Sequence, residues 1–240
     1  MSGTYYGVPP ITARLRRAAR DEGAVGAGAR LGGWGARYLA GRVRPPRGTF
    51  TFAGRTYAYL AHRHNFTWMH ERAVEIPIAR AFLEAAEGRV LEVGHVLGHY
   101  GSGGHEVVDK YEREPGVRNE DVLDLDPATR YDVVVSVSTL EHVGVDDEPR
   151  DPGRAVAAVE RLHELLAPGG RLLVTLPAGY NPALDDAVRA GTLPFGEVRA
   201  MIRAGAGMRW RECPPGEALV QPYDRLLFRA RAVLVCTTRA

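Results

Sequence analysis

The sequence predicts an α/β fold built on a doubly wound, mostly parallel sheet. Residues 131–138, YDVVVSVS, form a nearly continuous apolar run, as expected of a central parallel strand buried on both faces. Residues 89–99, RVLEVGHVLGH, indicate a buried strand that ends in a glycine-containing loop. Residues 151–170 have the pattern of an amphipathic helix ending in Pro-Gly-Gly, and the apolar run 171–177 follows. Strands alternating with helices in this way are typical of parallel βαβ units.

An N-terminal accessory region, residues 1–60, is expected ahead of a main domain that spans 61–240. Within the accessory region, ITARLRRAAR (11–20) predicts a basic helix, and the Gly- and Ala-rich stretch 23–35 predicts loose packing. Alternating aromatic residues on either side of an Ala-Gly turn predict a β-hairpin at 49–60.

This N-terminal region is strongly basic. Residues 1–50 hold nine arginines against two acidic residues, a net charge of +7, whereas the rest of the chain sums to −5. No aromatic platform accompanies these arginines, so nucleic-acid binding is not expected. We expect a packing or assembly arm, which could also contact other enzymes of the same pathway.

Residues 61–72, AHRHNFTWMHER, precede the amphipathic helix VEIPIARAFLEAA. The three histidines of this segment do not have the spacing of a metal-ligand set, and no metal site is predicted. We expect the segment to lie over a polar ligand, with His64 and Asn65 as substrate contacts.

The remaining strands follow in order along the chain. Short apolar runs punctuated by turns predict them, and two late apolar runs are expected to close the sheet. The predicted strands are 89–94, 105–109, one within 117–125 with Asp121 near its end, 131–138, 171–177, 218–230 and 232–238.

The loop after the first of these strands is expected to bring a nucleotide-like ligand to the carboxyl edge of the sheet. Gly94 and Gly98 let the backbone approach a ligand closely, and Glu92 places a carboxylate near the end of the strand. Val96 stands where a dinucleotide fold would have its second glycine, and no lysine or arginine is at hand for a pyrophosphate. The loop therefore indicates an adenosine ligand without phosphates.

Two acids at neighbouring strand ends fit such a ligand. Asp109 can accept both ribose hydroxyls, and Asp121 can accept an adenine amino proton while the Val122 amide meets a ring nitrogen. The alternative is that each acid caps a helix or lies in a solvated loop.

The ordered set of motifs VLEVGHVLG, VVD, NEDVLDL, YDVVVSVSTLEHV and LLAPGGRLLVTLP resembles the class I S-adenosylmethionine-dependent methyltransferases. The resemblance covers residues 88–178. It implies a seven-stranded sheet whose last strand is antiparallel, with S-adenosylmethionine as cofactor and S-adenosylhomocysteine as product. The cofactor-binding residues it implies are Glu92, Gly94, His95, Gly98, Asp109, Asp121, Val122 and Ser138.

The chain departs from that family pattern in two places. The first motif has the form ExGxxxG and lacks the central glycine, and only eleven residues separate Asp109 from Asp121. Both departures concern the wall of the site on the adenine side.

A narrower resemblance rests on HNFTW, HER, VEIPI, GHVLGHYG, VVDKYE, STLEHVG and LPAGYN. These segments are similar to methyltransferases that act on sugars in polysaccharide and aminoglycoside pathways. In its general pattern and arginine-rich composition, the chain most resembles the aminoglycoside N-methyltransferases of gentamicin-type biosynthesis. The resemblance implies methylation of an amino group on an aminosugar in antibiotic biosynthesis.

Two acidic loops at the predicted catalytic edge agree with a cationic, hydroxylated acceptor. Ordinary solvated loops are the alternative. The predicted substrate contacts in these loops are Asp146, Asp147, Asn181, Asp185 and Asp186.

An amine must be neutral to attack a methyl sulfonium, so a base is needed. We expect His142 to be that base, with Glu141 orienting it or binding the substrate, and Tyr180 as a further acceptor contact. The alternative is that Glu141 and His142 only brace the methionine end of the cofactor.

Other functions remain open from the sequence. They are O-methylation of a sugar hydroxyl, RNA methylation guided by the arginines, and a cofactor-binding regulatory subunit without turnover. No apolar run approaches the roughly 20 residues needed to cross a bilayer, and MSGTYYGVPP lacks the order of a signal peptide. Two cysteines give no disulfide framework, so we expect a cytoplasmic protein without membrane contact.

Overall fold

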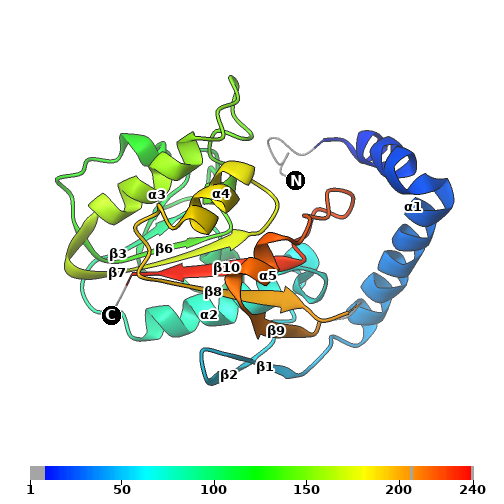
Figure 1. Ribbon diagram of the computed structural model, residues 1–240. Coiled ribbons are helices and arrows are strands. Elements are labelled where there is room, and N and C mark those ends of the chain that lie inside the picture. Colours follow the sequence, from blue (N-terminus) through cyan, green and yellow to red (C-terminus); the bar gives the residue numbers. More distant parts are fainter. Residues whose placement is uncertain (1–8, 206–207, 239–240) are drawn as a thin grey trace.

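The computed structural model describes residues 9–205 and 208–238 and shows one large sheet with helices on both faces (Figure 1). Residues 1–8, with most of the N-terminal decapeptide considered above, lie outside this description. The large sheet has the strand order β5-β4-β3-β6-β7-β10-β8-β9. Its strands are β3 (Val90–Val93), β4 (Glu106–Val108), β5 (Val117–Arg118), β6 (Tyr131–Val137), β7 (Leu166–Pro177), β8 (Glu197–Arg203), β9 (Trp210–Cys213) and β10 (Ala232–Thr237).

Five α-helices and a separate hairpin surround the sheet in the described residues. The helices are α1 (Ile11–Val43), α2 (Arg72–Glu84), α3 (Arg154–Glu164), α4 (Pro182–Ala190) and α5 (Pro215–Leu219), and the hairpin strands are β1 (Thr49–Phe52) and β2 (Arg55–Ala58). Short 3-10 turns cover His64–Met69, Leu97–Tyr100, Val122–Asp124 and Leu140–His142.

The strand directions confirm the predicted doubly wound, mostly parallel fold. Strands β5, β4, β3, β6 and β7 run parallel, and β10, the last strand of the chain, is antiparallel to β7. The sheet has eight strands rather than the expected seven, because β9 adds to the edge beside β8.

The prediction of a closing strand at 218–230 is wrong. This stretch contains the end of α5 and then a loop with one isolated bridge, and Pro222 has no N–H to give to a ladder. The strands missing from the prediction are β8 and β9, both of which carry charged residues. These charged residues are accommodated at the sheet surface, where Arg199 of β8 pairs with Glu212 of β9 at 2.8 Å.

Two hydrophobic layers hold the sheet between its helices (Figure 1). Helices α3, α4 and α5 cover one face, where Val159 and Leu162 of α3 are fully buried. Helix α2 and the β1–β2 hairpin cover the other face through Ile76, Phe50 and Phe52. Strand β6 is buried on both faces, as its apolar run predicted.

Helix α2 carries a proline in its interior that the tertiary structure accommodates. Pro77 has no N–H, so the carbonyl of Ala73 loses its normal helical partner. The Leu60 N–H donates to that carbonyl at 3.1 Å instead. The segment entering α2 is thereby attached to the helix at the point where the helix lacks its own bond.

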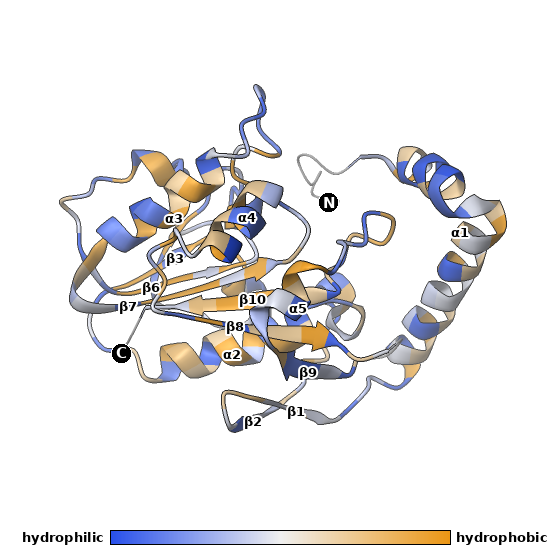
Figure 2. Ribbon diagram, viewed as in Figure 1, coloured by the Kyte–Doolittle hydropathy of each residue, from blue (hydrophilic) through white to orange (hydrophobic). Residues whose placement is uncertain are grey.

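Helix α1 is longer and more regular than predicted. The stretch expected to be loosely packed, 23–35, is helical, and the helix is interrupted only at Gly23 (φ 80°, ψ 153°). Aromatic packing compensates for its many glycines, since the rings of Trp34 and Tyr38 stack with centroids 5.4 Å apart. Figure 2 shows much of α1 as hydrophilic or neutral, whereas the central strands are largely hydrophobic. Within the described residues, no helix combines the length and apolar character needed to cross a membrane.

Helix α1 contacts the loop that leads into β10. Arg14 donates to the carbonyl of Leu226 at 2.9 Å, and Arg30 pairs with the buried Asp224 at 2.5 Å. Some of the arginines of this helix therefore bind groups within the same chain and are not free for a partner.

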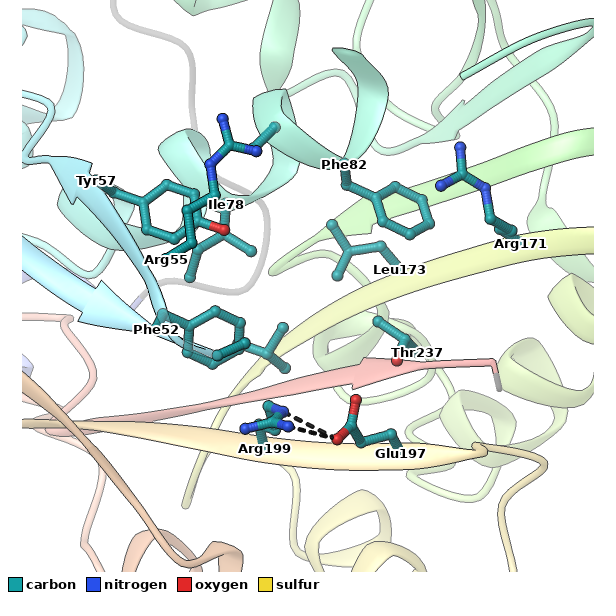
Figure 3. A pocket seen from close by; sticks show the side chains of 13 residues that line it. Phe52, Arg55, Tyr57, Ile78, Phe82, Arg171, Leu173, Glu197, Arg199 and Thr237 are labelled. Atoms are coloured by element: carbon teal, nitrogen blue, oxygen red, sulfur yellow. Dashed lines mark hydrogen bonds and ion pairs between the residues drawn. The ribbon is translucent and has the colours of Figure 1, made fainter. Parts of the chain in front are cut away.

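A pocket of about 260 Å³ lies between the hairpin, α2 and the sheet (Figure 3). Leu173, Glu197 and Thr237 are paired neighbours on β7, β8 and β10 there, and Leu173 lies level with the middle of β6. Among the described residues, none from the loops that follow β3 and β6 lines this pocket. Its arginines already have partners, which are Glu84 for Arg55, the Ala85 carbonyl and the Phe82 ring for Arg171, and Glu197 and Glu212 for Arg199.

The junction between α1 and the rest of the protein depends on a glycine. A Cβ at Gly41 would lie 2.2 Å from Nε1 of the buried Trp68, whereas a Cβ at Gly35 of the same helix would meet nothing within 4 Å. We expect Gly41→Ala to lower the free energy of unfolding by about 1–3 kcal/mol through overpacking. Gly35→Ala, the matched control, should raise it by up to about 1 kcal/mol. Urea unfolding measures both, and equal effects would show that the indole does not restrict this helix.

Candidate functional site

The loop after β3 is shaped by a close approach between two strand ends. Gly94 has φ 89°, and a Cβ there would lie 2.0 Å from Oγ1 of Thr139, which follows β6. Any other residue would strain the backbone and push the two loops apart. This packing therefore requires glycine at position 94, and contact of Gly94 with a cofactor stays a prediction.

Glu92 is buried and serves the loop itself. Its carboxylate accepts hydrogen bonds from the N–H groups of Val96 and Leu97 at 2.8 and 2.7 Å, and it pairs with Nε2 of His105 at 2.7 Å. Predicted as a cofactor contact, Glu92 is placed by the structure as the internal support that sets the path of residues 94–97.

Asp109 connects the loop after β3 with the loop after β4. One carboxylate oxygen accepts from the His95 N–H at 3.0 Å, and the other accepts from Tyr111 and Glu112 at 2.8 and 2.9 Å. A carboxylate has about four lone-pair directions, so one remains for a ligand. Binding of a ribose by Asp109 stays a prediction.

Asp121 caps the turn that begins at Val122 and accepts from the Leu123 N–H at 3.1 Å. Its carboxylate also pairs with Lys110 and Arg154, both at 3.1 Å. Burial works against ionisation, but these partners outweigh it and hold the pKa of Asp121 below its ordinary value. Asp121, predicted as an adenine contact, thus lies in a charged cluster, whereas the side chain of Val122 packs in the hydrophobic core.

Lys110 extends that cluster to the acidic loop after β6. It pairs with Asp147 at 3.1 Å, and the Tyr111 hydroxyl donates to the same carboxylate. Asp147, predicted as a substrate contact, is therefore neutralised by the loop after β4.

A row of imidazoles lies beside the glycine loop. The rings of His64 and His99 stack with centroids 4.3 Å apart, and His95 follows at 4.7 Å from His99. Gly98 makes room for this row, since a Cβ there would lie 2.3 Å from Nε2 of His95. Burial lowers the pKa of His99, and the neighbouring His95 lowers it further. Asn65, next to His64, has a left-handed backbone (φ 52°).

The residues predicted to be catalytic come together after β6 and β7. Nδ1 of His142 lies 2.5 Å from Asp146, and Nε2 lies 3.6 Å from Oε1 of Glu141. The Tyr180 hydroxyl donates to the same Asp146 at 3.0 Å, and its ring lies 4.6 Å from that of His142. Asp146 was expected to bind substrate, but in the structure it orients His142; the spacing of four residues between them was the signal.

The charges in this cluster are mutually dependent. Burial lowers the pKa of His142, but the hydrogen bond to Asp146 and the charge of Glu141 outweigh it and raise the pKa above the ordinary value. Glu141 is itself 2% exposed, and burial raises its pKa to about 7. Its Oε2 atom is buried without a hydrogen-bond partner in the described part of the chain. A ligand donor would satisfy it.

An internal ion pair beneath the cluster escaped the sequence analysis. Arg72 pairs with the fully buried Glu75 at 2.9 Å and donates to the carbonyls of Val137 and Ser138 at 3.2 and 3.3 Å. Glu75 also accepts from the hydroxyls of Ser138 and Thr175. Ser138, a predicted cofactor contact, is held here with a left-handed backbone (φ 39°).

Aromatic residues of the loop before β10 form a further wall that was not predicted. Tyr223 packs edge-on against Tyr180 at 4.9 Å, and Phe228 lies 5.7 Å from Tyr223. Arg225 donates to the Tyr180 carbonyl at 3.1 Å. Because 218–230 was predicted as a strand, none of these residues was expected at the edge.

Of the remaining predicted substrate contacts, two support the local structure. Asn181 caps α4 by accepting from the Ala183 N–H at 3.0 Å and donates to the Glu141 carbonyl at 3.3 Å. Asp185 is buried, accepts from the Gly179 N–H at 2.8 Å, and has its pKa raised by burial to about 6. Asp186 lies on the exposed side of α4 and pairs with Arg189.

No protein-family model and no curated protein sequence matches this chain. Solved structures with similar architecture include the N-methyltransferase NodS of Bradyrhizobium japonicum with S-adenosylhomocysteine (15% identity, 70% of this chain, 85% of that chain, TM-score 0.45). Another is a possible histamine N-methyltransferase of Thermotoga maritima (17%, 69%, 88%, 0.43). A third is the 1,6-didemethyltoxoflavin N1-methyltransferase of Burkholderia thailandensis (18%, 80%, 98%, 0.41).

The raised pKa of His142 depends on Asp146. We expect Asp146→Asn to lower the pKa of His142, because burial then outweighs the remaining attraction of Glu141. The imidazole resonances in an NMR titration measure this shift. Asp147→Asn, whose carboxylate pairs with Lys110 instead, is the matched control and should leave His142 unchanged. A similar shift in both variants would mean that general loop charge, not the Asp146 contact, sets this pKa.

Glu141 should make stability depend on pH. Its folded pKa of about 7 lies above the ordinary 4.5, so the folded protein loses stability as pH rises from 4.5 to 7. We expect Glu141→Gln to be more stable than the parent above pH 7, by about 1–3 kcal/mol, with the difference vanishing near pH 4.5. Thermal unfolding at several pH values measures this, with the exposed Glu160→Gln as control. A constant difference at every pH would contradict the raised pKa.

Proposed function

We propose that this protein transfers a methyl group from S-adenosylmethionine to an amino group of a small, polar acceptor of the aminosugar type. The observation that carries the proposal is the His142–Asp146 pair, joined by Glu141 and Tyr180 at the carboxyl edge of the sheet. That edge also holds the glycine loop after β3, and ligands of doubly wound sheets bind there. S-adenosylmethionine is the cofactor, and S-adenosylhomocysteine is the product.

The reaction is an in-line displacement. The acceptor nitrogen forms a bond to the methyl carbon while the carbon–sulfur bond breaks and its electron pair stays on sulfur. The nitrogen must then lose a proton. Nδ1 of His142 faces Asp146, which leaves Nε2 as the atom that takes this proton. Positioning the two reactants can supply roughly 7–11 kcal/mol of the barrier reduction.

The buried Glu141 carboxylate supports an amine acceptor. Its Oε1 atom lies 3.6 Å from Nε2 of His142. Its Oε2 atom has no partner in the described part of the chain and would accept a hydrogen bond from an N–H of the acceptor. The acidic loops give less support than their composition suggested. Asp146, Asp147 and Asp186 all have partners within the chain, so they do not form a free anionic surface.

The second candidate is O-methylation of a sugar hydroxyl. The His142–Asp146 pair favours it specifically, because an imidazole supported by a carboxylate is suited to deprotonating a hydroxyl. A regulatory subunit that binds the cofactor without turnover is the remaining alternative.

The N-terminal region, residues 1–60, would then act as an accessory element to the catalytic domain, 61–240. Helix α1 contacts the loop before β10, whose Tyr223 packs on Tyr180, so the region adjoins the acceptor side. A role in contacting other pathway enzymes fits its exposed basic surface. Cys213 and Cys236 are both buried and unpaired, which supports a reducing, cytoplasmic setting.

Methyl transfer can be tested with labelled S-adenosylmethionine and two acceptors of similar size, an aminoglycoside and a neutral oligosaccharide. We expect the aminoglycoside to be methylated, and His142→Ala to reduce turnover by roughly 10²- to 10⁴-fold as a lost general base. Cofactor affinity by calorimetry should change little. His163→Ala, at an exposed position on α3, is the control.

Each alternative predicts a different result. If only the neutral oligosaccharide is methylated, the acceptor is a hydroxyl group and O-methylation replaces N-methylation as the proposed function. Cofactor binding without turnover on either acceptor would favour the regulatory subunit. No measurable cofactor binding would remove the methyltransferase proposal.

A further inference from the structure

Three side chains from two loops converge beside the row of imidazoles. His95 and His99 belong to the loop after β3, and Glu112 belongs to the loop after β4. Each offers one possible ligand atom, and these atoms all lie within 4.8 Å of one another. In the described part of the chain, no hydrogen bond or ion pair engages these three ligand groups, and Nδ1 of His95 is buried without a partner.

We propose that His95, His99 and Glu112 bind one divalent transition-metal ion, with Zn²⁺ as the preferred ion. Two imidazole nitrogens and one carboxylate oxygen are a donor set that suits zinc and disfavours Mg²⁺ and Ca²⁺, which prefer oxygen ligands. The proposal goes beyond the proposed methyl transfer, which needs no metal. It also reverses the expectation from the sequence, where only the histidines of 61–72 were considered.

The backbone prepares this arrangement. His95 and His99 are four residues apart on a tight turn, so their side chains can lie on one side of it. Gly98 between them carries no Cβ, which leaves space for the His95 ring. The spacing His-x-x-x-His was therefore a usable sequence signal.

Asp109 joins the two segments that carry the ligands. Its carboxylate accepts from the His95 N–H at 3.0 Å and from the Glu112 N–H at 2.9 Å. The main chains of the two loops are thus fixed relative to each other by one side chain. Asp109 is a positioning residue for this site and not one of its ligands.

The separations need only small side-chain rotations to accept an ion. Zinc bonds of about 2.0–2.2 Å require ligand atoms roughly 3.3–3.5 Å apart in a tetrahedral site. Half-buried histidine and glutamate side chains can close the remaining distance by rotation. His64, stacked on His99 at 4.3 Å, restricts one side, and a fourth position is left for water or a ligand.

The experiment is a titration of tag-free, chelator-treated protein with ZnCl₂ by calorimetry, and with Co²⁺ followed by its visible d–d absorption. We expect one ion per chain with micromolar or tighter affinity. His99→Ala and Glu112→Gln should each weaken binding at least tenfold, and Asp109→Asn should weaken it by roughly tenfold through the lost positioning. The matched controls are His163→Ala and Glu160→Gln, both at exposed positions on α3, and they should bind like the parent.

Glu112→Gln lies in a surface loop and keeps the fold testable if His99→Ala does not fold, which circular dichroism will show. Absence of binding by the parent overturns the proposal, as does unchanged binding by Glu112→Gln or by the His99→Ala, Glu112→Gln double variant. Cofactor calorimetry on the metal-free parent separates this proposal from the methyltransferase proposal. Each can fail while the other stands.

Discussion

The buried ion pair of Arg72 and Glu75 is the interaction on which the carboxyl edge depends. It joins the first turn of α2 to the ends of β6 and β7, and it holds Ser138 in a left-handed conformation. Its charges reach farther than its contacts. The charge of Arg72 lowers the pKa of both His142 and Glu141. The attraction between these two residues raises the pKa of His142 and lowers that of Glu141, and Asp146 raises the pKa of His142 further. Removing one partner would leave an uncompensated buried charge beneath the site.

Carboxylates build much of this edge by binding backbone amides and cations. Glu92 fixes the loop after β3, Asp109 ties it to the next loop, and Asp121 organises the turn beyond. Each of these acids was predicted to contact the cofactor, because an acid at a strand end matches both roles. A single sequence shows the acid and its position but not which donors of the folded chain hydrogen-bond to it. The role of binding a cofactor and the role of holding a loop could therefore not be separated.

The fold was largely predictable because its signals are local. The apolar run of β6 and the amphipathic helix before β7 follow from periodicity, and strand order follows from the rules of βαβ connection. Strand β8 was missed because its charged residues suggested a loop. Their pairing with residues of β9 is a contact between strands that the local sequence does not reveal. The helical state of 23–35 was missed for the same reason, since Arg30 pairs with Asp224 and Tyr38 packs edge-on against Phe66, both far away in the sequence.

The grouping of side chains at the carboxyl edge was predictable, but many of their contacts were not. His142, Glu141 and Tyr180 were expected together and do lie together. Asp146 was assigned to substrate although its spacing from His142 allowed the contact that the structure shows. The aromatic wall of Tyr223 and Phe228 depended on recognising a loop in a stretch whose apolar content resembled a strand.

The proline in α2 has a consequence for how this protein can change. The Leu60 N–H can donate to the Ala73 carbonyl because Pro77 has no N–H to bond it. The proline that interrupts the helical hydrogen bonds therefore also allows the bond that attaches the segment before α2. A helix-forming residue at 77 would supply a competing N–H and make α2 more regular. The same change would release the segment that carries His64. A more regular helix would thus weaken the attachment of the neighbouring segment.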